Sequence, residues 1–165
     1  MTVVVSDTSP MRALDHLGCL DWLQTLFGTV YLPPAVASEL RKPPTAFQPL
    51  EVTACAFLRV LAPQNDARVS ELLSTLDAGE AEAIALAEEV SASVILIDEL
   101  AGREMSGRLG FSVQGTLGLL LEGKRRGWCS AICPLLDRLQ KELRFFVSPA
   151  VRESVLRRAG ELSDS

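Results

Sequence analysis

Two segments of the chain share a pattern, a mostly apolar run that stops at an aspartate: Val3-Val4-Val5-Ser6-Asp7 and Val94-Ile95-Leu96-Ile97-Asp98. Continuous apolar runs of this length are typical of strands that are buried on both faces of a parallel sheet. The functional crevice of an open parallel sheet lies at the carboxyl ends of its strands. We therefore expect both aspartates to lie at the same edge of such a sheet.

Helical and extended segments alternate along the rest of the chain. Further strands are expected in residues 29–32, 57–61, 111–113 and 144–147, with helices between them in 10–17, 20–27, 35–41, 66–76, 80–90, 99–109, 117–126, 134–142 and from 149 onward. This alternation predicts an α/β protein, a three-layer α/β/α sandwich around a central, mostly parallel sheet. No repeat or linker interrupts the pattern, so we expect a single domain over residues 1–165.

Capping residues indicate where several helices begin. Ser9 is expected to be the N-cap of the first helix, with Pro10 at the first helical position, and Ser148 the N-cap of the last. Asp77 and Glu80 have the D-x-x-E spacing of a capping box.

The composition excludes several classes of protein. The chain has 165 residues, of which 48% are hydrophobic, and a formal net charge of −5. This apolar fraction is too high for a disordered chain, and no segment reaches the roughly 20 apolar residues of a membrane span. With no secretory pattern at the start, one histidine and no C-x-x-C pair, we expect a cytoplasmic protein with reduced cysteines and no membrane partner. Enzymatic chemistry in such a chain would rest on carboxylates.

The charge is unevenly distributed. The net charge is −9 over residues 1–123 and +4 over the basic C-terminal segment, residues 124–165. An acidic chain is poorly suited to tight nonspecific binding of nucleic acid, but the basic segment offers a surface for phosphate or for a partner. Its run Lys124-Arg125-Arg126 has a second interpretation, because basic residues at a helix C-terminus stabilise the helix dipole.

Two glutamates lie on helix faces where a solvated glutamate is not expected. Glu39 shares a face with Ala35 and Val36, and Glu80 lies on an apolar stripe four residues before Ile84. Together with the two aspartates that end strands, they predict a carboxylate cluster.

Structural alternatives exist for two of these carboxylates. The side chain of Asp7 would also suit an Asx turn or the N-terminus of the following helix, and Glu80 would also suit the capping box with Asp77. The remaining glutamates of that helix are interpreted as solvated surface: Glu82, Glu88 and Glu89.

A cluster formed by Asp7, Glu39, Glu80 and Asp98 requires a compensating cation. Like charges within a few ångströms raise one another's pKa values unless a cation neutralises them. Hard oxygen ligands suit Mg²⁺ or Mn²⁺, and such ions activate water and stabilise the leaving oxygen in phosphodiester hydrolysis. The four residues therefore suggest metal-assisted cleavage of a phosphodiester.

The same residues resemble the motifs of PIN-domain nucleases. The stretch Val4–Pro10 resembles the family's opening strand, with its first metal-binding aspartate and a hydroxyl neighbour, and Pro33–Leu40 resembles the second acidic position. Glu80 and Asp98, 18 residues apart, resemble the third and fourth. The segments Leu76–Ile84, Gly115–Gly118 and Lys124–Gly127 are similar to a PIN-like branch of largely uncharacterised bacterial and archaeal proteins.

This resemblance implies an activity and partners. It implies the PIN fold and Mg²⁺- or Mn²⁺-dependent cleavage of single-stranded RNA, with Asp7, Glu39, Glu80 and Asp98 as metal-binding and catalytic residues. Many small relatives are toxins of toxin–antitoxin pairs, often homodimers held inactive by a small antitoxin protein.

The sequence leaves two alternatives to the nuclease. A catalytically weak PIN scaffold would bind a protein or nucleic acid without cleaving it. A phospho-accepting receiver domain also uses aspartates at strand ends, but it needs a lysine after a late strand, and Val113-Gln114-Gly115-Thr116 offers none.

Three further residues are candidate contacts to substrate or water. The Thr8 hydroxyl would hydrogen-bond a metal-bound water or a phosphate, and Arg103 would meet the RNA backbone, although a surface arginine is the simpler interpretation. Thr116 follows a glycine at a helix N-terminus, a natural anion site, although a plain N-cap is again simpler.

Overall fold

The computed structural model describes residues 2–45 and 47–162. The chain divides into two compact units, one that ends at Gly115 and one that begins at Thr116. We call them the N-terminal unit and the C-terminal unit. The single domain over residues 1–165 stays a prediction.

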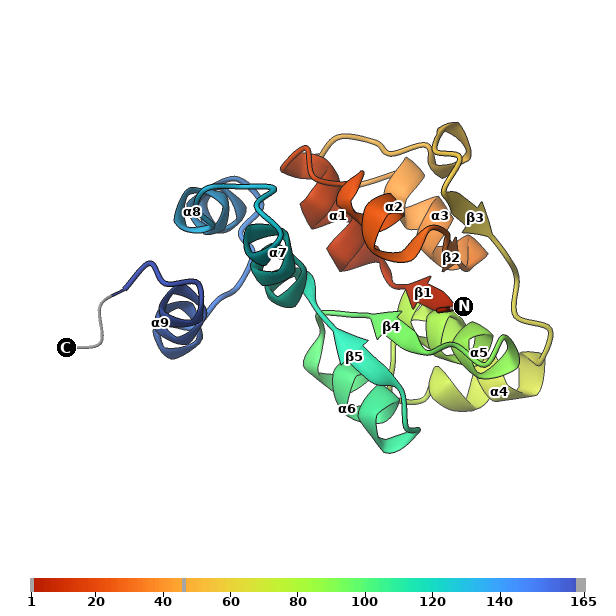
Figure 1. Cartoon of the computed structure of the whole chain (residues 1–165). Coiled ribbons are helices and arrows are strands. Elements are labelled where there is room, and N and C mark those ends of the chain that lie inside the picture. The colour runs from red at the N-terminus through yellow and green to blue at the C-terminus, as the bar shows by residue number, and fades with distance from the viewer. Residues whose placement is uncertain (1, 46, 163–165) are drawn as a thin grey trace. The chain divides into compact units, whose positions relative to one another are not determined.

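A parallel sheet of five strands forms the centre of the N-terminal unit (Figure 1). In the order β3-β2-β1-β4-β5, the strands are Leu58–Val60, Val30–Leu32, Val4–Ser6, Val94–Leu96 and Ser112–Gln114. The strand order reverses at β1, which pairs with β2 on one side and with β4 on the other. Ser6 is in register with Leu96, and the Asp7 N–H donates to the Leu96 carbonyl over 2.8 Å. The two apolar segments that end at Asp7 and Asp98 therefore form neighbouring central strands.

Helices cover both faces of this sheet. Figure 1 shows α1 to α3 on one face and α4 to α6 on the other. They span Thr8–His16 (α1), Trp22–Phe27 (α2), Pro34–Arg41 (α3), Asp66–Leu72 (α4), Ala78–Glu89 (α5) and Leu100–Arg108 (α6), with a short 3-10 helix, η1, at Val52–Ala54. Right-handed connections between parallel strands produce this division of helices between the faces. The predicted three-layer α/β/α fold is confirmed.

An apolar core lies between α5 and the sheet. Val5 of β1, Ile95 of β4 and Ile97 just after β4 are buried against α5, whose inner residues are mostly alanines. Because alanine side chains are small, the helix lies close to the strands. This packing holds the first turn of α5, which carries Glu80, near the carboxyl end of β1.

The C-terminal unit contains three helices: α7 at Thr116–Arg125, α8 at Cys133–Glu142 and α9 at Pro149–Arg158. The Glu161 carboxylate links them. It accepts hydrogen bonds from the backbone N–H groups of Ile132 (2.8 Å) and Cys133 (2.9 Å) at the start of α8, and it pairs with Lys124 of α7 at 3.0 Å. A carboxylate at a helix N-terminus is stabilised by the orphan N–H groups and the helix dipole.

Two local predictions were wrong. Residues 144–147 form no strand, because Arg144 has a φ of 53° and the Phe145 N–H donates to Leu139 at the end of α8. Ser9 is not an N-cap, since α1 begins at Thr8 with Asp7 in the capping position. Pro10 is tolerated at the third helical position because the first four N–H groups of a helix have no intrahelical acceptor.

Other expectations agree with the structure. Ser148 caps α9, accepting from the Val151 N–H, and all four cysteines are free thiols. Over the part of the chain that the structure describes, no helix has the length and apolar character needed to span a bilayer.

Candidate active site

Asp7 lies at the carboxyl end of β1, where the strand order reverses. Ligands of open α/β sheets bind at such switch points. The residue is only 4% exposed. It occupies the N-cap position of α1, yet its side chain makes no capping hydrogen bond. Capping therefore does not account for this buried carboxylate.

Glu39 reaches the same region from α3. Its Oε2 accepts a hydrogen bond from the buried Thr8 hydroxyl over 2.6 Å. This hydrogen bond fixes the orientation of Glu39, and a contact of the Thr8 hydroxyl with a metal-bound water or a phosphate stays a prediction. Thr8 therefore has a positioning role between α1 and α3.

Gly79, in the first turn of α5, leaves open the space that these side chains surround. A Cβ added to Gly79 would lie 3.0 Å from Asp7 Oδ1, 3.2 Å from Glu39 Oε1 and 3.5 Å from Thr8 Oγ1. Two carboxylate oxygens and a hydroxyl thus converge on one small space, which we call the Gly79 cradle.

Glu80 lies beside the cradle and also caps its own helix. The Glu80 N–H donates to Asp77 Oδ1 over 2.8 Å, and the Asp77 N–H donates to Glu80 Oε2 over 3.3 Å, which completes the capping box. The predicted capping box between Asp77 and Glu80 is therefore confirmed. Glu80 is nonetheless only 5% exposed, so one carboxylate combines capping with a buried position next to Asp7.

The acidic cluster is electrostatically strained. Burial, with the charges of Asp77, Glu80 and Glu39, raises the pKa of Asp7 to about 8, and a backbone hydrogen bond from Thr8 opposes part of this rise. Burial, and then the charge of Asp77, raises the pKa of Glu80. The sequence identified Asp77 as a cap but not as a member of this charge cluster.

Arg12 is a cation behind the cluster that the sequence analysis missed. Its Nη2 donates to the Glu39 carbonyl over 3.1 Å, and its guanidinium lies 4.8 Å from the ring centre of Phe47. Burial lowers the pKa of Arg12, while the charges of Glu39 and Asp7 raise it. Its position four residues after Thr8, on the same face of one helix, is the signal that would have identified it.

Asp98 and Arg103 lie in a different environment. A Cβ on Gly115 would lie 2.7 Å from Asp98 Oδ1 and 2.6 Å from Arg103 Nη1, and that nitrogen donates to the Ile97 carbonyl over 3.1 Å. Arg103 is therefore half-buried against the end of β4 rather than a surface arginine. Asp98 is not among the carboxylates that raise the pKa of Asp7 or Glu80.

The environments of Thr116 and Glu82 differ from those expected from the sequence. Thr116 is buried as the first residue of α7, in the C-terminal unit. Glu82 is not solvated surface, because it is half-buried and accepts the Ala35 N–H in the first turn of α3, over 3.1 Å. Glu82 thus anchors the helix that carries Glu39.

The donor chemistry of the cradle fits a hard divalent cation. Its ligating atoms are carboxylate and hydroxyl oxygens, the donors that Mg²⁺ and Mn²⁺ prefer, and a cation would relieve the repulsion that raises the pKa of Asp7. Within residues 2–45 and 47–162, no three His, Cys, Asp or Glu side chains already converge closely enough to hold an ion. Binding therefore requires side-chain adjustment around the cradle.

The metal-free protein is expected to lose stability as the pH rises from about 4 to about 8. Unfolded Asp7 releases its proton near 3.8 and folded Asp7 near 8, so the folded state binds more protons across this window. This stabilisation is complete below about pH 4, and roughly 5 kcal/mol of it is lost by pH 8. Urea unfolding with EDTA at several pH values measures it. Asp7→Asn should flatten the pH dependence, and an unchanged slope in that variant would contradict the assignment.

Comparison with known proteins agrees with this geometry. A family model described as a PIN domain matches residues 3–161, and PIN domains are generally nucleases. No curated protein matches the chain. With a match over nearly its whole length and a parallel α/β/α fold, the chain belongs to the PIN-domain family.

Proposed function

We propose that the protein is a Mg²⁺- or Mn²⁺-dependent endoribonuclease that hydrolyses phosphodiester bonds of single-stranded RNA. The observation that carries the proposal is the Gly79 cradle, where the buried Asp7 and the half-buried Glu39 direct oxygens into one open space at the switch point of the sheet. Membership of a family of nucleases supports the same reaction class.

Asp7, Glu39 and Glu80 would hold the ion, with Asp98 as a fourth, outlying acidic residue. A bound divalent cation supplies activation of a water molecule and stabilisation of the leaving oxygen. Thr8 orients Glu39 through its hydroxyl, and Glu82 anchors α3. Arg103 holds the end of β4 through the Ile97 carbonyl. A substrate contact by Arg103 or Thr116 stays a prediction.

The biological setting is part of the proposal. We propose a cytoplasmic homodimer that acts as the toxin of a toxin–antitoxin pair and is held inactive by a small antitoxin. Light scattering during size-exclusion chromatography tests the dimer. Growth arrest on expression, relieved by co-expression of a candidate small antitoxin protein, tests the toxin role.

A second candidate is a catalytically weak PIN scaffold that binds a protein or nucleic acid. The observation that favours it is that, among the described residues, no three acidic or other ligating side chains converge on one point. It predicts a stable partner complex and little affinity for metal.

One pair of measurements separates the two candidates. Purified protein is incubated with end-labelled single-stranded RNA and Mn²⁺ or Mg²⁺, and Mn²⁺ binding is titrated by calorimetry. The nuclease should cut internally and lose this activity with EDTA. A folded protein that neither binds Mn²⁺ nor cuts RNA would refute the nuclease and leave the scaffold.

A further inference from the structure

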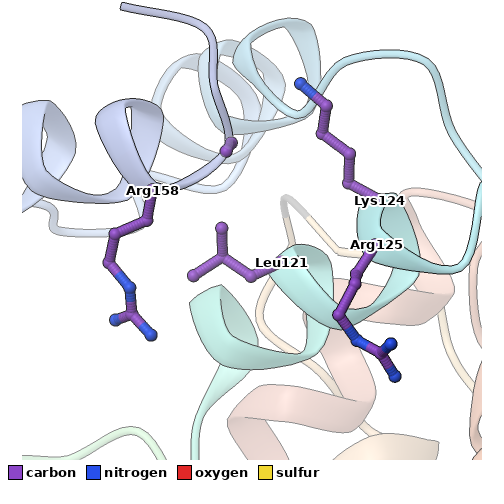
Figure 2. Close-up of a pocket in the computed structure, with 5 residues that line it drawn as sticks. Leu121, Lys124, Arg125 and Arg158 are labelled. Carbon is purple, nitrogen blue, oxygen red and sulfur yellow. The ribbon is translucent and has the colours of Figure 1, made fainter. Parts of the chain in front are cut away.

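A cavity lies within the C-terminal unit, between the ends of α7 and α9. Its volume is about 230 Å³, and it is lined by Leu121, Lys124, Arg125, Arg158 and Ala159. Figure 2 shows the Leu121 side chain pointing into the space between Arg158 and Arg125, with the two guanidinium groups on either side of it. The cavity thus has an apolar floor and a cationic rim.

The cations of this rim differ in how far they are neutralised. Lys124 pairs with Glu161 at 3.0 Å. Arg125 pairs with Glu122, which also receives Arg126 at 2.8 Å. One carboxylate therefore serves two arginines, and the end of α7 retains positive charge.

Arg158 is the cation most available to a ligand. It is exposed, and no carboxylate in residues 2–45 or 47–162 pairs with it. Its neighbour Arg157, in the same last turn of α9, is already paired with Glu153 at 2.7 Å. An unpaired guanidinium beside a hollow is a potential binding group for an anion.

Helix-dipole stabilisation accounts for only part of this arrangement. Basic residues in the last turn of α7 and α9 stabilise those helices, and Lys124, Arg125 and Arg157 already provide that charge. The dipole does not require an apolar residue such as Leu121 between two guanidinium groups. That combination suits a ligand with an anionic group joined to a flat or apolar one.

A nucleotide unit has this chemistry. Guanidinium groups match phosphate oxygens in a planar, two-pronged geometry, while an apolar floor contacts sugar or base. An acidic peptide would satisfy the cations but leave Leu121 without a matching surface. The net charge of +4 over residues 124–165, against −9 before them, also directs a polyanion to this part of the chain.

We propose that this cavity binds a phosphodiester group of single-stranded RNA, with Arg158 on the phosphate and Leu121 against the attached nucleoside. The choice of RNA rests on the proposed function. The site would give the C-terminal unit a role in holding substrate.

Binding is tested on the full chain without catalysis. Anisotropy of a fluorescein-labelled oligouridine of about ten nucleotides is measured with EDTA at several salt concentrations. Arg158→Ala should weaken binding about fivefold and reduce the slope of log K against log salt by about 0.7, the value for one phosphate contact on a single strand. Leu121→Glu, which places a carboxylate on the cavity floor, should weaken it further.

Arg157→Ala is the matched control, because it removes the same charge from the same helix turn outside the cavity. It should bind RNA nearly as wild type does, and circular dichroism should show all variants folded. Equal weakening by Arg157→Ala, no effect of Arg158→Ala, or displacement of RNA by oligoglutamate at equal concentration would overturn the proposal. Displacement by millimolar inorganic phosphate alone, without nucleoside, would overturn the role of Leu121.

These results are independent of cleavage. Arg158-dependent binding by a protein that never cuts RNA would refute the nuclease and retain this site. RNA cleavage and RNA affinity that are both unchanged by Arg158→Ala would refute this site and retain the nuclease.

Discussion

Asp7→Asn should reduce RNA cleavage by about three orders of magnitude. The substitution keeps the size of the side chain and removes the negative charge that binds the cation, a loss of several kcal/mol of transition-state stabilisation. The protein should remain folded, and at pH 8 without metal it should be more stable than wild type, because a buried carboxylate with a pKa of about 8 no longer has to ionise. Initial rates on labelled single-stranded RNA at saturating Mn²⁺ and urea unfolding measure the two effects.

Asp66→Asn provides the control for this change. Asp66 is exposed in the first turn of α4, so the same substitution there should leave cleavage within about twofold of wild type. Cleavage by Asp7→Asn at the wild-type rate would refute the assignment of the site. Asp98→Asn, measured beside it, shows whether the carboxylate next to Arg103 belongs to the metal site.

Gly79→Ala should weaken Mn²⁺ binding at least tenfold without unfolding the protein. The added methyl group would lie 3.0 Å from Asp7 Oδ1 and 3.2 Å from Glu39 Oε1, so it would fill the cradle and displace both oxygens. Alanine is favoured over glycine within a helix by up to about 1 kcal/mol, which offsets part of this crowding. Calorimetric titration with Mn²⁺ and thermal unfolding distinguish loss of the site from loss of the fold.

Gly107→Ala is matched to this variant. Gly107 is also helical, in α6, but a Cβ there would have no neighbour within 4 Å. It should gain the same helical stabilisation and bind Mn²⁺ as wild type does. If the two glycine variants bound Mn²⁺ equally, the cradle would not be the metal site.

The fold could be predicted because its decisive features are local. The runs that end at Asp7 and Asp98 are almost entirely apolar, and such runs are typical of strands that are covered on both faces. The predicted strand at residues 144–147 failed for the opposite reason. Its aromatic and β-branched residues favour a strand, but Arg144 adopts a left-handed conformation, and the Phe145 N–H bonds to α8 instead of a sheet. Tertiary context overrode local propensity there.

The candidate site was predictable in its acidic members but not in their partners. Helical spacing placed Glu39 and Glu80 on inner faces, and the structure buries Glu80 and half-buries Glu39. Glu39 accepts hydrogen bonds from the Thr8 hydroxyl and, at its carbonyl, from the Arg12 guanidinium. Both contacts join α1 to α3, which are about 30 residues apart in the sequence. Sequence spacing carries no information on such contacts, because they depend on how α1 and α3 pack.

The pairing of β1 with β4 also has a consequence for protein synthesis. Leu96, the strand partner of Ser6, is synthesised 90 residues after it. The central strand therefore remains unpaired on one side until the residues of β4 have emerged. A nascent chain in which β4 has not yet emerged therefore lacks the assembled carboxylate cluster, so the proposed nuclease would stay inactive until that strand pairs with β1.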